Sequence, residues 1–394
     1  MLAFTFPGQG SQRPAMGAAW VDHPSWELVD DASLAADRDV ARLLLQADAE
    51  ELRDTRNAQL ATFVLSMVVL DAVERLGISP ALAAGHSLGE YSALVAVGAL
   101  SFDDGVRVVA ERGEAMQSAA EDNPGTMAAI LGLDDDQCDV ACRRADGDVW
   151  VANYNAPGQV VIAGSGEAVA IAGDIAKQLG AKKTMMLPVG GAFHTPFMTP
   201  ARQRLRKALA GAAFADCEVA VVANVDNTSH ITAEDWPSLL SAQLSSPVRW
   251  RQSLVEMVAM GVSLLAELGP GGVLTGLARR GVSDVRAVAV ATPADLDKLV
   301  EAVAPTTHLV GTPRLQDGEH LYVHERLVVS PAAGVFTPDV TAVQVGRPVD
   351  VGGLLGHVGG VDVRSAFAGV LQGMLAVDGE RVMTGEPIAW LRST

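Results

Sequence analysis

The sequence predicts an α/β protein with a mainly parallel sheet, an inserted small domain and a C-terminal all-β module. Three observations support this. Strand-length apolar runs alternate with helical patterns through the first 300 residues, which favours a parallel sheet covered on both faces. The order of elements changes between residues 125 and 189, and convincing helical patterns cease after residue 322. A chain of 394 residues is long enough for two or three domains.

The large domain is expected in two segments, 1–124 and 190–300. Its expected strands, in chain order, are 2–6, 81–84, 219–222, 262–268 and 285–290. Helical periodicity covers 57–76 and 88–97, and a capping box at Ser101 begins a helix that continues through Ala120. A further helix after residue 196 and one that ends at Arg279-Arg280 complete this domain.

The segment 125–189 has the element order β-α-β-β-α-β. Its expected strands are 126–132, 149–153, 159–164 and 183–187, and its helices are 134–145 and 167–179. The turn 155–158 separates the two central strands. This order is typical of a ferredoxin-like unit, so we interpret the segment as a small domain inserted in the larger one.

Gly85-His86-Ser87-Leu88-Gly89 has the pattern G-x-S-x-G between an expected strand and an expected helix. This pattern is the strand-to-helix elbow of hydrolase-like α/β domains, which exposes a serine hydroxyl on a sharp turn. The helix folds back on its strand so closely that a Cβ at either glycine would collide. A helix N-terminus also stabilises the negative charge that develops during attack. Ser87 is therefore the candidate nucleophile.

A serine nucleophile needs a base and an oxyanion site. His194 is the candidate base, because its Gly-rich loop follows the inserted unit and can return to the elbow. Gln9 lies in a turn with two glycines directly after the first strand, where backbone can approach the same pocket. His320 and His324 are four residues apart but have no third ligand, so no metal site is predicted.

Composition excludes several classes of protein. The formal net charge of −18 argues against nucleic acid and anionic membranes as partners. Three scattered cysteines give neither a disulfide framework nor a zinc pattern, which indicates a reducing, cytoplasmic location. The N-terminus lacks the features of a signal peptide, and the apolar run 60–73 is too short and polar to span a bilayer.

Residues 301–322 are expected to be a linker, and 323–394 a separate β domain rich in Val and Gly. Two half-motifs recur in this domain. Ser330-Pro331-Ala332-Ala333-Gly334-Val335 corresponds to Ser365-Ala366-Phe367-Ala368-Gly369-Val370, and the segment 346–352 corresponds to 379–385. Such a repeat indicates a sandwich with pseudo-twofold symmetry.

Residues 1 to about 300 resemble the malonyl-CoA:acyl carrier protein transacylases and the acyltransferase domains of polyketide and fatty acid synthases. The markers, in chain order, are Pro7-Gly8-Gln9-Gly10-Ser11-Gln12, Gly85-His86-Ser87-Leu88-Gly89-Glu90-Tyr91, Glu111-Arg112-Gly113, Asn153-Tyr154-Asn155-Ala156-Pro157-Gly158-Gln159, Ala192-Phe193-His194, Gln243, Pro247-Val248-Arg249-Trp250 and Gly269-Pro270-Gly271. Each marker alone is weak, but their joint occurrence in this order is specific.

The resemblance implies that malonyl-CoA acylates Ser87, with His194 as the general base and acid. The backbone N–H groups of Gln9 and Leu88 would form the oxyanion hole. Arg112 would bind the free carboxylate of the malonyl group, for which its planar guanidinium is suited.

The family orients its histidine by a backbone carbonyl near Gln243, without a carboxylate. Gln243 and Asn155, together with Gln159, are assigned to the substrate pocket, although for Asn155 and Gln159 a structural role in the turn is an equal alternative. Phe193 is a bulky residue where malonyl-using members have one, which implies selectivity against methylmalonyl groups.

The acceptor would be the phosphopantetheine thiol of an acyl carrier protein, and carrier proteins are usually acidic. Docking would then need a local basic patch, because this chain is acidic too. The candidates are two clusters, Arg202, Arg204, Arg206 and Lys207, or Arg279 and Arg280. An ordinary solvated helix face is the alternative for each cluster.

The C-terminal module resembles a biotinyl/lipoyl-attachment domain, in which a hairpin presents a lysine for modification. The corresponding stretch is 357–362, and no lysine follows Lys298 anywhere in the chain. We therefore expect no biotin, no lipoate and no other cofactor. The module would be an unmodified domain with a docking role in a synthase or a stabilising role.

Two other functions are compatible with parts of the sequence. A serine hydrolase or thioesterase of the α/β-hydrolase type would share the elbow and would draw on Asp226, His230 and Asp284, but it leaves Arg112 and Gln9 without roles. A non-catalytic scaffold would be favoured by loss of Ser87, His194 or Arg112, and all three are present. The sequence leaves open the pathway, fatty acid or polyketide, as well as the carrier and the oligomeric state.

Overall fold

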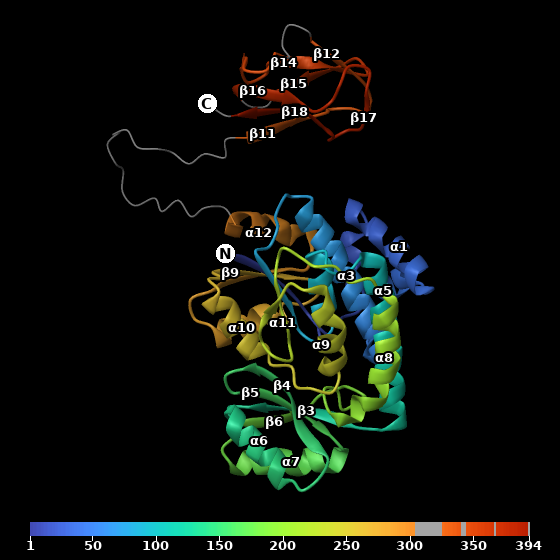
Figure 1. Cartoon of the computed structure of the whole chain (residues 1–394), viewed down its shortest axis with the longest axis vertical. Coiled ribbons are helices and arrows are strands. Elements are labelled where there is room, and N and C mark those ends of the chain that lie inside the picture. Colours follow the sequence, from blue (N-terminus) through green and yellow to red (C-terminus); the bar gives the residue numbers. More distant parts are fainter. Residues whose placement is uncertain (304–324, 340–343, 366–367, 393–394) are drawn as a thin grey trace, which may run out of the picture. The chain divides into compact units, whose positions relative to one another are not determined.

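The computed structural model describes residues 1–303, 325–339, 344–365 and 368–392 (Figure 1). It divides into two compact units, Met1–Thr306 and Thr307–Thr394, which are described separately. The first unit contains the large and small domains, and the second contains the C-terminal β domain.

The large domain has a six-stranded sheet with the order β10-β9-β1-β2-β7-β8. Its strands are β1 (Leu2–Phe6), β2 (Leu82–Gly85), β7 (Val221–Val222), β8 (Ser229–His230), β9 (Leu264–Leu268) and β10 (Arg286–Val290). All neighbours pair in parallel except β7 and β8, which are antiparallel. The strand β8 was not predicted, because two residues are too few to carry a periodic signal. Since β1 and β2 are parallel neighbours, the loops after them, which contain Gln9 and Ser87, leave the same edge of the sheet.

Alternating residues of the central strands cover the two faces of this sheet, as expected for a sheet with helices on both sides. Phe4, Phe6 and Ala83 belong to one hydrophobic cluster together with residues of α3 and α5. Ala3 and Leu82 belong to another cluster with residues of α10 and α11. The helices of the large domain are α1 (Glu27–Ala36), α2 (Val40–Leu45), α3 (Thr55–Glu74), α4 (Gly89–Ala96), α5 (Phe102–Asp122), α8 (Thr199–Gly211), α9 (Trp236–Gln243), α10 (Trp250–Ala259), α11 (Val273–Gly281) and α12 (Leu296–Val303).

Two helical features differ from the sequence expectations. The helix α12 continues to Val303, so the linker expected from residue 301 begins within a helix, and the rest of that linker lies outside the described residues. By length and composition alone α3 could cross a membrane, which the sequence does not predict from the run 60–73. However, 89% of its most apolar window is buried inside the protein, which makes it a core helix.

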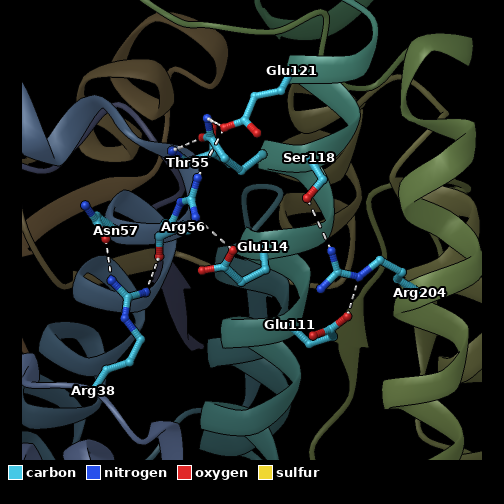
Figure 2. A network of polar contacts seen from close by, with 10 residues as sticks. Arg38, Thr55, Arg56, Asn57, Glu111, Glu114, Ser118, Glu121 and Arg204 are labelled. Carbon is cyan, nitrogen blue, oxygen red and sulfur yellow. Dashed lines mark hydrogen bonds and ion pairs between the residues drawn. The ribbon is translucent and has the colours of Figure 1, made fainter.

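The helices α3 and α5 lie unusually close together, and ion pairs connect them at the surface. A Cβ on Gly113 would lie 2.9 Å from the Cα of Arg56, so only glycine permits this approach. Arg56 pairs with Glu114 at 3.1 Å and with Glu121 at 3.2 Å, both on α5 (Figure 2). Such half-exposed pairs contribute little energy, so the close approach of the two helices depends mainly on their packing at Gly113.

The small domain is an antiparallel sheet with the order β4-β5-β3-β6. Its elements are β3 (Thr126–Leu131), α6 (Asp135–Arg144), β4 (Val149–Ala156), β5 (Gln159–Gly164), α7 (Gly166–Gln178) and β6 (Lys183–Met186). The two helices cover the side of this sheet that faces away from the large domain (Figure 1). The element order and the strand order are those of a ferredoxin-like unit.

The strand β4 is longer than expected, because the turn is only Pro157-Gly158. Ala156 pairs with Gln159 across this two-residue turn, in which Gly158 has a φ of +68°. Asn155 therefore belongs to a strand. The N–H of Tyr154 donates to the carbonyl of Val248 at 2.9 Å, which holds the end of β4 against the large domain.

The described residues of the second unit form two four-stranded sheets, β11-β18-β16-β13 and β15-β14-β12-β17, in which every described pair is antiparallel. The strands are β11 (Glu325–Val329), β12 (Gly334–Pro338), β13 (Pro348–Val349), β14 (Leu354–Val358), β15 (Val361–Arg364), β16 (Gly369–Met374), β17 (Arg381–Val382) and β18 (Pro387–Arg392). The sequence repeat begins β12 in its first half and β16 in its second. β13 pairs with β16 and β12 pairs with β17, so each half supplies a strand to the sheet of the other. This exchange gives the unit the expected pseudo-twofold arrangement.

Candidate active site

Ser87 lies on a sharp turn between β2 and α4, with a φ of +53°. A Cβ on Gly85 would lie 1.8 Å from the carbonyl carbon of Gly89, and a Cβ on Gly89 would lie 2.0 Å from the carbonyl oxygen of Phe6. Both glycines are therefore required by sterics, as the sequence predicted. The left-handed backbone of Ser87 is the kind of local strain that functional sites retain.

Asn224, which follows β7, fastens this elbow to the sheet. Its Oδ1 accepts a hydrogen bond from the N–H of Ser87 at 2.7 Å, and its Nδ2 donates to the carbonyl of Gly85 at 2.7 Å. One side chain thus holds both arms of the turn.

His194 is the base next to the nucleophile. Its Nε2 lies 2.8 Å from Ser87 Oγ, and its Nδ1 lies 2.9 Å from the carbonyl oxygen of Gln243. A carbonyl can only accept, so Nδ1 carries the proton and Nε2 accepts the hydrogen bond of the serine hydroxyl. Burial, followed by the positive charge of Arg112, lowers the pKa of His194 to about 3. The imidazole is therefore neutral and can take a proton.

Arg112 projects from α5 to the same hydroxyl, and only 1% of its surface is exposed. Its Nη2 lies 3.0 Å from Ser87 Oγ and 2.9 Å from Gln243 Oε1, and its Nη1 donates to Gln59 Oε1. Within the described part of the chain, no carboxylate forms an ion pair with this guanidinium, and its Nε has no hydrogen-bond partner. Burial lowers the pKa of Arg112. A buried cation without an ion-pair partner beside a nucleophile is suited to an anionic substrate group.

A cavity of about 420 Å³ opens onto Ser87 and His194. Its wall residues are Gln9, Gly10, Gln12, Pro14, Ala49, Leu52, Arg53, His86, Met116, Met127, Asn153, Asn155, Val161, Leu187, Pro188, Val189 and Phe193. Most of these side chains are apolar, which suits the carbon chain of a short acyl group. Asn155 contributes an amide whose Oδ1 lies 2.9 Å from His86 Nε2.

The predicted oxyanion-hole residues lie in two loops, Gln9 in the loop after β1 and Leu88 in the elbow after β2. Gln9 lines the cavity, whereas the side chain of Leu88 is buried in the core. Among the described residues, the backbone N–H groups of Gln9 and Leu88 have no hydrogen-bond partner. These two donors are therefore free to bind a developing oxyanion.

Three of the predicted substrate-binding residues, Arg112, Gln159 and Gln243, are not among the residues that line the cavity. Arg112 is buried behind its wall and reaches the site through Ser87 Oγ. Gln159 is paired with Ala156 in the β4–β5 hairpin. Gln243 is fully buried, and its amide contacts Arg112, the carbonyl of Ser87 and Glu90 instead. Its side chain holds other groups in place, and its backbone carbonyl orients His194, as expected.

The histidine of the hydrolase alternative has other partners. His230 lies 3.0 Å from both Asp226 and Asp235, whereas the base that contacts Ser87 is His194. Asp284 is exposed and contacts only Ser283 among the described residues. No Ser-His-Asp triad is formed by the residues that this alternative would use.

Three residues of the site were given no role from the sequence: Gln59, Glu90 and Asn224. Glu90 had been noted only as part of the elbow motif. Gln59 carried a weak signal, as a polar residue at the start of a long buried helix. Asn224 carried none, since a single asparagine after a two-residue strand has no pattern.

The described residues contain no group of three or more His, Cys, Asp and Glu side chains that could hold a metal ion. His320 and His324, the pair considered for metal binding, lie outside the described residues.

Comparison with known proteins agrees with this geometry. The acyl transferase domain family matches residues 3–312. The malonyl CoA-acyl carrier protein transacylase of Bacillus subtilis is 39% identical over 307 residues, which cover 77% of this chain and 97% of that protein. The Escherichia coli K12 protein of the same name is 42% identical over 307 residues, covering 76% and 99%.

Solved structures give the same result. The acyl-carrier-protein S-malonyltransferase of Burkholderia pseudomallei has a TM-score of 0.74 and 39% identity, and the match covers 76% of this chain and 99% of that one. A malonyl-transacylase in complex with a type II PKS acyl-carrier protein has a TM-score of 0.74 and 40% identity, with the same coverage. Through its first 312 residues, the chain belongs to the family of malonyl-CoA:acyl carrier protein transacylases.

Proposed function

We propose that this protein transfers a malonyl group from malonyl-CoA to the phosphopantetheine thiol of an acyl carrier protein, through a malonyl ester on Ser87. The observation that carries the proposal is Arg112, a buried guanidinium without a carboxylate ion-pair partner among the described residues, 3.0 Å from the nucleophilic oxygen. A malonyl group ends in the carboxylate that this cation lacks, and a bidentate pair would hold it.

In the first half-reaction, Ser87 Oγ attacks the thioester carbonyl while its proton passes to His194 Nε2. The N–H groups of Gln9 and Leu88 stabilise the oxyanion. The tetrahedral intermediate then collapses, the C–S bond breaks, and His194 returns the proton to the sulfur of CoA. The carbonyl of Gln243 keeps the imidazole in the required tautomer throughout.

The second half-reaction runs the same steps in reverse with a different thiol. His194 takes the proton of the carrier thiol, and its sulfur attacks the ester carbonyl of malonyl-Ser87. Collapse breaks the C–O bond and returns the proton to Ser87 Oγ. The apolar wall of the cavity disfavours water as a competing acceptor.

The test is to incubate the protein with malonyl-CoA and follow its intact mass. We expect a single malonyl adduct that persists until a phosphopantetheinylated carrier protein is added, and no adduct on Ser87→Ala. An adduct that hydrolyses without a carrier would indicate a thioesterase, and labelling of Ser87→Ala would refute the assignment. A panel of carriers from fatty acid and polyketide synthesis would identify the pathway.

We propose that the carrier docks on Arg279 and Arg280 at the end of α11. In the cluster on α8, Arg204 is paired with Glu111 at 2.8 Å (Figure 2). Arg202 and Arg206 donate hydrogen bonds to serine hydroxyls. Arg279 and Arg280 are exposed and have no ion-pair partner among the described residues.

The docking site is tested by reversing charge. The variant Arg279→Glu/Arg280→Glu should raise the KM for the carrier protein and leave formation of the malonyl-enzyme unchanged. The matched control is Arg204→Glu, which breaks only the contacts to α5. If Arg204→Glu raised the KM for the carrier protein more than the double variant does, the carrier would dock on α8 instead.

We propose that the C-terminal unit is a biotinyl/lipoyl-like domain that remains unmodified and has a docking or stabilising role. Two sheets with exchanged strands and a β14–β15 hairpin support this proposal. The hairpin turn is Gly359-Gly360, with φ of +55° and +86°, and such positions favour glycine over the lysine that modification needs. After expression with biotin and lipoate, the intact mass should be that of the bare chain. Any added cofactor mass would overturn this proposal.

A further inference from the structure

Glu90 is a buried carboxylate behind the nucleophile that the transfer steps above do not use. It lies in the first turn of α4 and has no exposed surface. Its Oε1 accepts the backbone N–H of Asn224 at 2.6 Å, and its Oε2 accepts the side-chain N–H of Gln243 at 2.6 Å. No hydrogen bond joins it directly to Ser87, His194 or Arg112, so its hydrogen-bonded link to them runs through these two partners, although its negative charge also attracts Arg112 through space.

The two partners of Glu90 hold the nucleophile, the base and the cation. Asn224 bonds both arms of the elbow around Ser87. Gln243 donates from Nε2 to the carbonyl of Ser87 at 2.9 Å and accepts at Oε1 from Arg112 at 2.9 Å. Its backbone carbonyl accepts from His194. Nucleophile, base and cation are therefore each one hydrogen bond away from a residue that Glu90 holds.

The polarity of these contacts allows only one orientation of the Gln243 amide. An ionised carboxylate only accepts, so the amide must turn its NH2 group toward Glu90 and its oxygen toward Arg112. The flipped amide would direct NH2 at the guanidinium, where donor would face donor, and would direct its oxygen at a carboxylate. Both errors would leave buried polar groups without partners, which is costly.

We infer that Glu90 is a positioning residue that fixes the orientation of the Gln243 amide and, through it, places Arg112 to receive the carboxylate of the donor. This inference rests on the proposed malonyl transfer. Selectivity between malonyl-CoA and acetyl-CoA then depends in part on Glu90, a carboxylate that does not contact the substrate.

The test is Glu90→Gln, which keeps the volume and adds a donor. The new NH2 group faces either the NH2 of Gln243 or the N–H of Asn224, so the amide of Gln243 loses its fixed orientation. We expect kcat/KM for malonyl-CoA to fall about tenfold or more, the range for a lost hydrogen bond to a charged group. Acetyl-CoA has no carboxylate for Arg112, so its rate should fall much less. Burial raises the pKa of Glu90 to about 7, and assays at pH 8 therefore keep the wild-type carboxylate ionised.

Glu267 provides a matched control. It is also a buried carboxylate, 1% exposed, and it accepts the N–H groups of Leu274 at 3.1 Å and Thr275 at 2.7 Å. Glu267→Gln should keep the wild-type ratio of malonyl to acetyl transfer. A shift of that ratio as large as in Glu90→Gln would show that any buried carboxylate has this effect and would overturn the inference.

A double-mutant cycle separates positioning from general stability. If Glu90 acts through Arg112, then Glu90→Gln should change the malonyl-to-acetyl ratio little in an Arg112→Ala background. Additive effects, or equal losses with both donors in the single variant, would overturn the inference. If Glu90→Gln does not fold, Gln243→Met tests the same link, because it removes the amide between Glu90 and Arg112. A wild-type ratio of malonyl to acetyl transfer in Gln243→Met would refute the inference. Failure of wild-type protein to accept malonyl-CoA would instead refute the proposed function, so the two failures are distinguishable.

Discussion

Arg112 Nη2 lies 3.0 Å from Ser87 Oγ, on the same hydroxyl that His194 contacts at 2.8 Å. The serine oxygen therefore accepts from a cation while its hydrogen bonds to a base. Arg112, which would bind the carboxylate of the malonyl group, therefore directly contacts the serine oxygen that would attack the thioester carbonyl.

Replacement of Arg112 by alanine should change donor preference rather than abolish catalysis. Losing one partner of a buried charge pair costs about 2–5 kcal/mol, and an acetyl group never forms that pair. We expect acylation by malonyl-CoA to fall steeply and acylation by acetyl-CoA to fall far less. Acylation rates of Ser87 with the two donors measure this. Equal losses would make Arg112 a structural residue.

The acylation rate should show no inflection at the usual pKa of histidine. Burial and Arg112 lower the pKa of His194 from 6.5 to about 3, so the base stays neutral as the pH falls from 8 to 5. Acetyl-CoA is the suitable donor for this measurement, because its transfer does not depend on the carboxylate site at Arg112. We expect a flat profile of kcat/KM between pH 5 and 8. Glu90, whose pKa burial raises to about 7, titrates in the same range, so the profile is measured in Glu90→Gln as well. A loss of activity centred near pH 6.5 in both proteins would show that His194 titrates as an ordinary histidine.

Phe193 should make the enzyme prefer malonyl over methylmalonyl groups. Its ring lines the cavity next to His194, where an extra methyl group would need space. One methyl group discriminates by about 1–3 kcal/mol, so we expect a large but incomplete preference. Phe193→Ala should reduce the preference for malonyl over methylmalonyl groups. Phe197 lies outside the cavity wall, so Phe197→Ala should leave this preference unchanged. Competition between the two donors measures the ratio, and equal wild-type rates would contradict the prediction.

Gly85→Ala should destroy the elbow. The new methyl group would lie 1.8 Å from the carbonyl carbon of Gly89, which is backbone and cannot rotate away. We expect a destabilisation of about 3 kcal/mol or more and loss of the malonyl adduct. Gly166→Ala is the control, because a Cβ there meets no atom within 4 Å. Urea unfolding and intact mass would measure both effects, and a stable, active Gly85→Ala protein would disprove the steric argument.

Removal of the residues after about 310 should leave acylation of Ser87 intact. Each of the two units is compact by itself, and the acyl transferase family matches residues 3–312. A folded, truncated protein that cannot form the malonyl-enzyme would contradict this division. If acylation of Ser87 is unchanged and only transfer to the carrier protein falls, the result would support a docking role for the C-terminal unit.

The sequence by itself determined the features that depend on short-range geometry. The elbow follows from the two glycines around Ser87, because the collision that a Cβ on Gly85 would cause is with Gly89, four residues along the chain. The collision at Gly89 is with Phe6 of the neighbouring strand and therefore depends on the sheet. The strands of the large sheet and the β-α-β-β-α-β order of the small domain follow from local periodicity. The absence of lysine after Lys298 is likewise a property of the sequence alone.

Only the tertiary structure decided how the site is held together. Ser87 meets His194 across 107 residues and Asn224 across 137, and no local pattern encodes contacts at such separations. The same holds for Gln243, whose amide turns away from the cavity because the acceptors of Glu90 and the donors of Arg112 leave it one orientation. Residue types and spacing indicate which groups can react. The packing of distant elements determines where each donor and acceptor points, because every buried polar group must find its partner in the folded chain.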